Sequence, residues 1–163
     1  MRYTFITGLY GTGKTTLACL LDKVCPESLC SFDDLYNYAD DASMCAVYDR
    51  LSDMGGAIMD AIPIIYPHHL PMFNEFRRMR HVQSVIVTYC TYNEWVTNRL
   101  PTKLTTYTLD ASTRYLDEYT QFYKESFLLD FLDTHMSDMT IYYNTSNGSV
   151  RQERPCFDQL IKG

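Results

Sequence analysis

The sequence lacks the long apolar runs of membrane proteins and is poor in basic residues. No run approaches the roughly 20 apolar residues of a membrane span, and the short apolar stretch after Met1 and Arg2 ends in a glycine-rich loop, unlike a signal peptide. A soluble, cytoplasmic protein without membrane partners is therefore expected. The 163 residues, 46% of them hydrophobic, suit a single domain spanning 1–163.

Cysteines are present, but no pair has the C-x-x-C spacing of a zinc or redox site. Several lie in apolar runs, so we expect six buried, reduced thiols. They are Cys19, Cys25, Cys30, Cys45, Cys90 and Cys156. His68 and His69 are not expected to bind a metal, because neighbouring side chains point apart and no third ligand is evident.

Positive charge is scarce: 14 Lys and Arg residues face 20 Asp and Glu, a net charge of −6. This balance argues against broad, non-specific nucleic-acid binding but leaves room for a local basic cleft. The sequence has a single positive cluster, which is either a solvent-facing helix side or a contact for an anionic acceptor. It consists of His68, His69, Arg77, Arg78, Arg80 and His81.

Apolar periodicity alternates between strand and helix patterns, which predicts an α/β domain with a mostly parallel sheet. Strands are expected at 3–6, 28–32, 57–59, 84–89 and 140–143. Helices are expected at 15–24, 41–54, 72–80, 93–100, 112–133 and 155–161, with Pro101 ending the fourth. Five strands with crossover helices indicate three α/β/α layers. The 112–133 helix either belongs to the core or lines an acceptor site.

Glycine is also scarce, yet three of the seven glycines fall in GLYGTGKTT, residues 8–16. Gly8, Gly11 and Gly13 lie in the pattern G-x-x-x-x-G-K-[ST] between a strand and a helix, the context of a phosphate-binding loop. Glycines let the backbone N–H groups approach phosphate oxygens, and the following helix adds its N-terminal dipole. The motif therefore predicts a P-loop fold that binds a nucleoside triphosphate, with ATP as the default ligand.

Within this loop, Lys14 is expected to reach the β- and γ-phosphates, and the Thr15 hydroxyl to bind Mg²⁺. Thr12 and Thr16 complete the expected ATP-binding set. Asp60, at the end of the third expected strand, has a Walker B-like placement that suits a Mg²⁺ ligand.

The acceptor side must decide between a kinase, a GTPase switch and a motor ATPase. The sequence lacks the N/T-K-x-D motif that reads guanine, and the chain is short for a motor ATPase. Asp33 follows the second expected strand, where it could take the proton of an acceptor hydroxyl. Asp34 is the expected helix cap beside it, in the acceptor site. These features favour a small kinase.

A short lid is expected where a helix ends in Arg99, with Lys103 four residues on. Cations at this position could cover ATP and neutralise charge in the transition state. Arg99 could also stack on adenine. The alternative is a solvated helix end.

With these motifs in order, residues 1–125 resemble a P-loop kinase, most closely the kinase domain of phage polynucleotide kinases. The resemblance implies that Asp33 is the general base and Asp60 the acid of the third strand, and that Arg99 and Lys103 occupy two arginine positions of the lid. It implies an ATP- and Mg²⁺-dependent transfer to a hydroxyl of a nucleic acid or nucleotide. Lys103 keeps the charge of the second arginine but loses its planar fork.

The second departure lies three residues after the expected base, where the family has an arginine that holds an acceptor phosphate. This chain has Tyr36, which could instead stack on a base. That suits related phage kinases of a hydroxymethyl pyrimidine in DNA, a DNA-modifying activity that needs an extruded base. A kinase of a free nucleoside or small metabolite and a nucleotide-binding regulatory protein remain alternatives, and the oligomeric state stays open.

Overall fold

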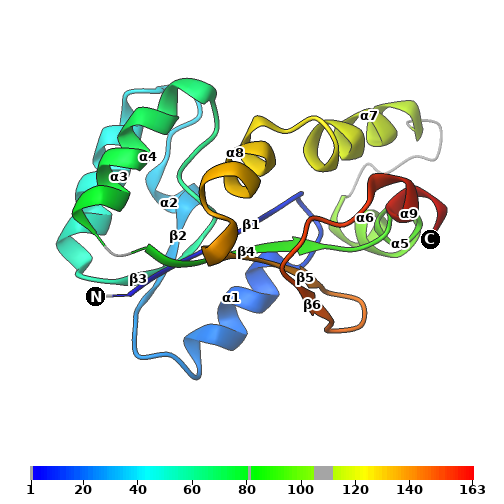
Figure 1. The fold of residues 1–163 in the computed structure, drawn as a ribbon, viewed down its shortest axis with the longest axis horizontal. Coiled ribbons are helices and arrows are strands. Elements are labelled where there is room, and N and C mark those ends of the chain that lie inside the picture. Colours follow the sequence, from blue (N-terminus) through cyan, green and yellow to red (C-terminus); the bar gives the residue numbers. More distant parts are fainter. Residues whose placement is uncertain (1, 81, 105–111) are drawn as a thin grey trace. The chain divides into compact units, whose positions relative to one another are not determined.

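The computed structural model describes residues 2–80, 82–104 and 112–163. Six strands are hydrogen-bonded in the order β2-β3-β1-β4-β5-β6 (Figure 1). Their bounds are β1 (Tyr3–Gly8), β2 (Leu29–Ser31), β3 (Ala57–Asp60), β4 (Val82–Tyr89), β5 (Thr140–Asn144) and β6 (Val150–Arg151). β1 and β2 both pair with β3 in parallel, whereas β6 is antiparallel to β5.

The helices alternate with these strands as the sequence pattern predicts. They are α1 (Lys14–Asp22), α2 (Phe32–Leu35), α3 (Ser43–Met54), α4 (Leu70–Met79), α5 (Tyr92–Glu94), α6 (Leu100–Lys103), α7 (Ser112–Tyr123), α8 (Phe127–His135) and α9 (Phe157–Lys162). Short turns of other helix types are η1 (Pro67–His69), η2 (Trp95–Arg99) and η4 (Ser137–Met139). Among the described residues, none of the helices is long and apolar enough to span a bilayer.

The chain forms two compact units. Unit 1 comprises Met1–Thr7 and Lys14–Ile86, and unit 2 comprises Gly8–Gly13 and Val87–Gly163. The boundary falls inside the GLYGTGKTT loop, so the glycine half of the loop belongs to unit 2 and Lys14 begins the return to unit 1.

Unit 1 has three layers, with α1 on one face of its strands and α3 and α4 on the other (Figure 1). Alternation along β1 supplies both faces, as expected for a strand buried on both sides. Ile6 packs with Ala18 of α1 and Ile58 of β3. On the opposite face, the ring of Tyr3 meets Phe76 of α4 edge-on, with centroids 5.1 Å apart.

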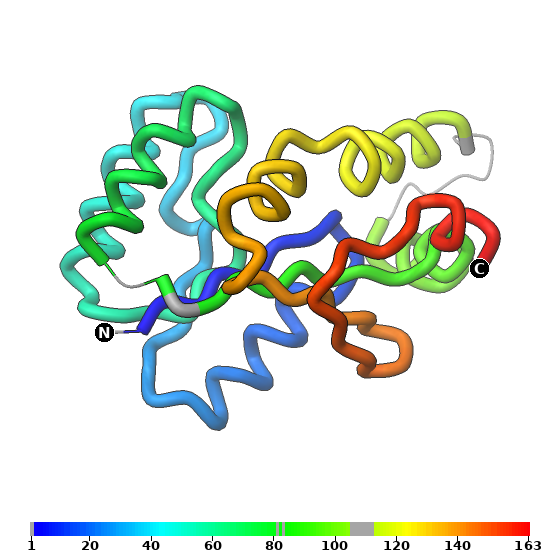
Figure 2. The backbone as a smooth tube through the Cα atoms, in the orientation of Figure 1, coloured from blue at the N-terminus to red at the C-terminus, as the bar shows by residue number. Residues whose placement is uncertain are grey.

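Unit 2 is held together by hydroxyl groups of α7 that reach the end of β4. Tyr119 Oη donates to the carbonyl of Cys90 at 2.7 Å, and Tyr123 Oη donates to the carbonyl of Thr88 at 3.0 Å. Both rings are buried, which confirms the core interpretation for this part of the expected helix. α9, near the C-terminus, lies beside α5 (Figure 2).

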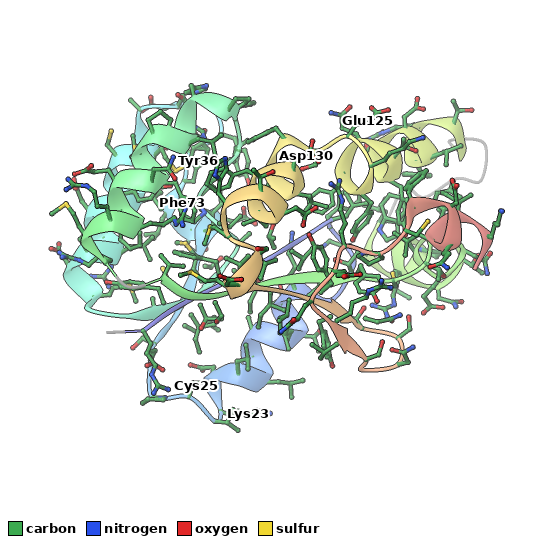
Figure 3. The ribbon with its side chains drawn as sticks, in the orientation of Figure 1. Lys23, Cys25, Tyr36, Phe73, Glu125 and Asp130 are labelled. Carbon is green, nitrogen blue, oxygen red and sulfur yellow. The ribbon has the colours of Figure 1, made fainter. Side chains whose placement is uncertain are left out.

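The expected single helix over 112–133 is wrong, because α7 ends at Tyr123 and α8 begins at Phe127. Ser126 is the N-cap of α8, and its Oγ accepts hydrogen bonds from the backbone N–H groups of Leu128 and Leu129. Glu125 lies in the turn between the two helices (Figure 3). The apolar stripe continues across this turn, so periodicity alone could not reveal the break.

Pro101 does not end its helix as expected, because α5, η2 and α6 run continuously from Tyr92 to Lys103. The intervening turn is a π-helix in which the N–H of Leu100 donates to the carbonyl of Trp95, five residues earlier. A proline inside an α-helix lacks its own N–H and collides with the preceding turn. The wider π turn accommodates such a residue without breaking the helix.

Two further expectations need correction. The sheet has six strands instead of five, since the two-residue β6 is too short to leave a sequence pattern. All six cysteines are free thiols, but only Cys90 is buried. The exposed ones include Cys19, because only a narrow stripe of α1 faces the strands, leaving Leu20 53% exposed. Lys23 and Cys25 follow the last turn of α1 (Figure 3).

Candidate functional site

The glycine half of the phosphate loop is fixed within unit 2 by Thr88 at the end of β4. A Cβ atom on Gly8 would lie 2.2 Å from Thr88 Oγ1 and 2.8 Å from its carbonyl oxygen, and the φ of Gly8 is +152°. Only glycine fits here without displacing the strand. The buried Thr12 hydroxyl also pairs with Thr88 Oγ1, at 2.9 Å, and donates to the carbonyl of Leu9 at 2.5 Å.

Trp95 supports the next turn of the same loop. Its Nε1–H donates to the carbonyl of Tyr10 at 2.8 Å, and its ring is fully buried. A Cβ atom on Gly11 would lie 3.3 Å from Trp95 Nε1, so the indole closely follows the loop backbone. Tyr10 in turn donates its hydroxyl to Glu118 of α7.

Arg99 lies beside Gly13. A Cβ atom on Gly13, which has a φ of +97°, would lie 3.6 Å from Arg99 Nη1. Glu94 orients the guanidinium through a 3.2 Å contact with Nε, and Ser146 Oγ accepts from Nη2 at 3.4 Å. Hydrogen bonds from Asn98 and Arg99 lower the pKa of Glu94, which keeps this carboxylate charged. Unit 2 therefore brings a cation to the end of the glycine loop.

Unit 1 contributes the residues that follow Gly13 directly in the chain. Lys14 is the first residue of α1 and is half-buried, while Thr16 is exposed in the same first turn. Thr15 Oγ1 donates to Asp60 Oδ2 at the end of β3, at 2.9 Å. The two groups expected to bind Mg²⁺ are thus adjacent, although 45 residues separate them in sequence. A hydroxyl and a carboxylate are both hard oxygen ligands of the kind Mg²⁺ prefers.

Asp33 and Asp34 lie in α2, a four-residue helix, instead of a loop after the second strand. The N-cap of α2 is Ser31, so the expectation that Asp34 caps the helix is wrong. Both carboxylates are exposed. Asp33 Oδ1 accepts a hydrogen bond from the Tyr38 hydroxyl at 2.9 Å. Burial and this hydrogen bond raise the pKa of Tyr38 to about 12, so at neutral pH Tyr38 stays a donor.

Tyr36, at the position where the sequence resemblance led us to expect an arginine, is 5% exposed. Its ring stacks on Phe32 with centroids 5.0 Å apart and an interplanar angle of 19°. Its hydroxyl donates to Asp41 Oδ1 at 3.2 Å. Tyr36 thus fills space between Phe32 and the following loop, and Tyr38 is the neighbouring tyrosine with an accessible ring, 65% exposed.

His68 and His69 both point at one carboxylate, contrary to the expectation that they diverge. His68 Nε2 lies 2.7 Å from Asp41 Oδ2, and His69 Nε2 lies 2.6 Å from Asp41 Oδ1. The three groups offer ligand atoms within 4.8 Å of one another. The missing third group was Asp41, which lies 27 residues before His68 and leaves no local spacing pattern.

The hydrogen bonds of His69 nevertheless argue against a metal centre. Its Nδ1 accepts from the backbone N–H groups of Ile65 and Tyr66, at 3.1 and 3.2 Å. The ring proton is therefore on Nε2 and points at Asp41. A histidine that binds a metal through Nε2 carries its proton on Nδ1 and donates it to an acceptor. Asp41 is thus a hydrogen-bonding centre that joins Tyr36, His68 and His69, and donation from the two imidazoles lowers its pKa.

The positive cluster expected from the sequence does not exist as one group. His68 and His69 precede α4, whereas Arg77 and Arg78 lie in its last turn, near the start of β4. The ten residues of α4 separate the two ends by about 15 Å. Arg78 pairs with Glu75 on its own helix at 2.7 Å. His81 lies outside the described residues.

The roles expected for Asp33, Asp60 and Arg99 stay predictions, and sequence reasoning missed the side chains that hold the glycine loop. Thr88 was visible at the end of the clearest strand and Trp95 inside the expected lid, and neither pattern indicates a loop contact. Lys103, at the end of α6, is exposed. Its expected role stays a prediction.

Neither a protein-family model nor a curated protein matches this sequence. Among solved structures, the crystal structure of a gluconokinase from Sinorhizobium meliloti 1021 superimposes with a TM-score of 0.57. The alignment covers 99% of this chain and 87% of the gluconokinase, at 9% sequence identity. The chain shares the α/β fold of this structure. The expected α/β fold class is thereby confirmed, while at this identity the likeness concerns the fold alone.

Proposed function

We propose that this protein is an ATP-dependent kinase that uses Mg²⁺ to transfer the γ-phosphoryl group to a hydroxyl. The observation that carries the proposal is the 2.9 Å hydrogen bond between Thr15 and Asp60, directly after a phosphate-loop lysine. In P-loop enzymes, one hydroxyl and one carboxylate hold the metal that bridges the β- and γ-phosphates. Bound there, Mg²⁺ would neutralise phosphate charge.

On the donor side, Lys14 and the loop amides hold the phosphates. Arg99, beside Gly13, neutralises charge that develops on the transferring group, and Lys103 assists it. Glu94 contacts Nε of Arg99, and Ser146 accepts from Nη2, so the guanidinium is held in place through two of its three nitrogens. Charge stabilisation of this kind is the main contribution a protein makes to phosphoryl transfer.

On the acceptor side, Asp33 acts as general base. The hydroxyl oxygen of the acceptor bonds to the γ-phosphorus while the bond to the β,γ-bridging oxygen breaks, releasing ADP. The hydroxyl proton passes to Asp33, whose Oδ1 is already occupied by Tyr38, so Oδ2 is the oxygen that receives it. The product is a phosphate monoester.

The acceptor is a hydroxyl of a nucleic acid or nucleotide according to the sequence resemblance, either a 5′-hydroxyl end or a hydroxymethyl base of DNA. A second candidate is a small metabolite or free nucleoside. The fold of a gluconokinase, whose name denotes a small-molecule kinase, supports this second candidate equally well. A nucleotide-binding regulatory protein is the third candidate, and it requires that no transfer occur.

The test compares Asp33→Asn with Asp34→Asn, its neighbour on α2. Both changes remove one exposed carboxylate from the same short helix, so they match in charge. We expect Asp33→Asn to lower phosphate transfer by about 10²–10⁴-fold, the usual contribution of a general base, while ATP affinity stays within about twofold. Asp34→Asn should retain most activity.

The measurements are label transfer from γ-labelled ATP to a panel of DNA, modified DNA, RNA and nucleosides, and calorimetric titration with ATP. Full activity of Asp33→Asn would show that this residue is not the base. Tight ATP binding with no label on any acceptor would instead support the regulatory protein.

A further inference from the structure

The segment around the proposed base is strongly depleted in positive charge. Residues 24–76 contain nine carboxylates and one basic side chain other than histidine, Arg50. Four of the carboxylates lie at positions 33, 34, 40 and 41, within or directly after α2. A phosphate group bound beside Asp33 would therefore meet repulsion instead of the arginine that the family resemblance leads one to expect.

The remaining arginines of unit 1 do not compensate for this depletion. α4 carries Arg77 and Arg78 in its last turn, and Arg80 follows it, about 15 Å along the helix from the turn that contains His68. The turn that contains His68 is η1, which precedes α4 and contacts Asp41. The arginines are thus at the opposite end of the helix from residues 33–41, which we call the acceptor segment.

Residues 24–76 also expose aromatic rings. Tyr38 and Tyr66 are 65% and 48% exposed, and they are the two aromatic residues among the exposed large hydrophobic side chains of the described chain. Tyr38 is hydrogen-bonded to Asp33, and its ring centroid lies 5.0 Å from that of Tyr36. The His69 ring connects Tyr36 with Tyr66, its centroid 6.3 Å from that of Tyr36 and 5.5 Å from that of Tyr66. Tyr66 stacks on His68 with centroids 5.5 Å apart. Exposed rings held this way offer faces on which a planar ligand can stack.

The arrangement of these rings is fixed by Asp41. Its carboxylate accepts from Tyr36, His68 and His69, which joins the 36–41 segment to the turn that carries Tyr66. Two segments separated by more than 20 residues are thereby held in register next to Asp33. Such pre-organisation is typical of a binding surface, because less ordering remains for the ligand to impose.

We infer that the acceptor is an uncharged hydroxyl compound with a planar ring, of the nucleoside class, held by Tyr38 and Tyr66 beside Asp33. The inference rests on the proposed kinase function and narrows it. It gives a specific reason why the Tyr36 position lacks arginine: there is no acceptor phosphate to bind. A nucleotide or a nucleic-acid end is disfavoured by the carboxylates of residues 33–41.

The sharpest probe is a matched pair of acceptors: a nucleoside and its 3′-monophosphate, which share the ring and the 5′-hydroxyl and differ in the phosphate. A 5′-hydroxyl oligonucleotide and a neutral polyol without a ring complete the panel. Transfer is measured from γ-labelled ATP as kcat/KM. We expect the nucleoside to exceed its 3′-monophosphate by about 10-fold, the effect of a like charge roughly 8–10 Å away after screening.

Matched variants locate the cause of this preference. Asp40→Asn removes one carboxylate of the acceptor segment and can keep the hydrogen bond that Asp40 Oδ1 accepts from Ala42 N–H. As the control, Asp53→Asn removes a carboxylate from the exposed end of α3. Asp40→Asn should lower the ratio of kcat/KM for the nucleoside to that for its 3′-monophosphate about two- to threefold. Asp53→Asn should leave this ratio unchanged. Tyr66→Leu should raise KM for the nucleoside about 10-fold, as the loss of one stacking ring predicts, with little change in kcat.

Each outcome supports or overturns the inference. Equal or better transfer to the 3′-monophosphate or the oligonucleotide overturns it and leaves the kinase function standing. Better transfer to the ring-free polyol overturns the aromatic part. An absence of label on every acceptor refutes the proposed function itself, and the inference with it.

Discussion

At the scale of single residues, the phosphate loop depends on a contact that its own motif does not contain. Gly8 lies against the side chain and carbonyl of Thr88, 80 residues away. The motif predicts that a glycine is needed at this position, but not which atoms exclude a larger side chain. The answer required the fold, because it brings the end of β4 against the loop.

Gly8→Ala tests this contact. The added Cβ, 2.2 Å from Thr88 Oγ1, should lower the free energy of unfolding by about 1–3 kcal/mol through overpacking, and should weaken ATP binding. Gly148→Ala is the control, since Gly148 also has a positive φ but its nearest neighbour is Tyr143 Oη at 4.0 Å. Chemical denaturation measures both. Equal losses would show that backbone strain, and not the Thr88 contact, governs Gly8.

Asp41 leads to a prediction about pH. Hydrogen bonds from His68 and His69 hold the pKa of Asp41 below its usual value. A carboxyl whose pKa is lowered by folding adds stability that is fully present above its unfolded pKa, about 3.9, and is lost as the pH falls through the folded value. The difference in melting temperature between wild type and Asp41→Asn should therefore shrink as the pH falls below 4. A difference that grows below pH 4 would contradict this assignment.

The site residues that the sequence proposes are those with a local signal. Lys14 and Thr15 belong to a contiguous motif, and Asp33 and Asp60 follow recognisable strands. Asp41 could not be linked to His68 and His69 in this way, because their contact is made by two loops that meet only after folding. Nor could the sequence predict that the exposed ring beside Asp33 belongs to Tyr38 and not to Tyr36. Tyr36 is buried because its ring stacks on Phe32.

At the scale of elements, the boundaries of helices were less predictable than their existence. The apolar stripe of α7 continues into α8, and the signal for the break is one capping serine. Pro101 gave the opposite error, since it indicated an end where a π turn lets the helix continue. In both places, the local hydrogen-bond pattern overrides periodicity.

Ser126→Ala is the corresponding prediction for an element. It removes the side chain that accepts from Leu128 and Leu129, so we expect a loss of about 1 kcal/mol in the free energy of unfolding. For a chain of this length that lowers the melting temperature by roughly 2–4 °C. Ser137→Ala, at an exposed position in η4, should change it by less than about 1 °C. No difference between the two variants would show that the cap does not stabilise α8.

At the scale of the whole molecule, the alternation of strand and helix patterns predicted the fold class correctly. In the sequence, the glycine loop marks the end of β1 and the β-branched run marks β4. The gluconokinase superposition agrees with the predicted fold class. What sequence could not predict was the distribution of charge in space. The described members of the one positive cluster in the sequence lie at opposite ends of α4, and residues 33–41 carry four aspartates and no basic side chain.

The whole-molecule consequence of the proposed function is ligand-linked stability. A protein that binds MgATP in its folded state gains about 2.7 kcal/mol at 100 times the dissociation constant, which corresponds to a rise in melting temperature of roughly 5–10 °C. A Mg²⁺ site at Thr15 and Asp60 is tested most directly by measuring this rise with ATP, with and without Mg²⁺, for wild type and Asp60→Asn. We expect Mg²⁺ to increase the ATP-dependent rise in wild type and not in Asp60→Asn. An identical Mg²⁺ effect in both proteins would show that Asp60 does not hold the ion.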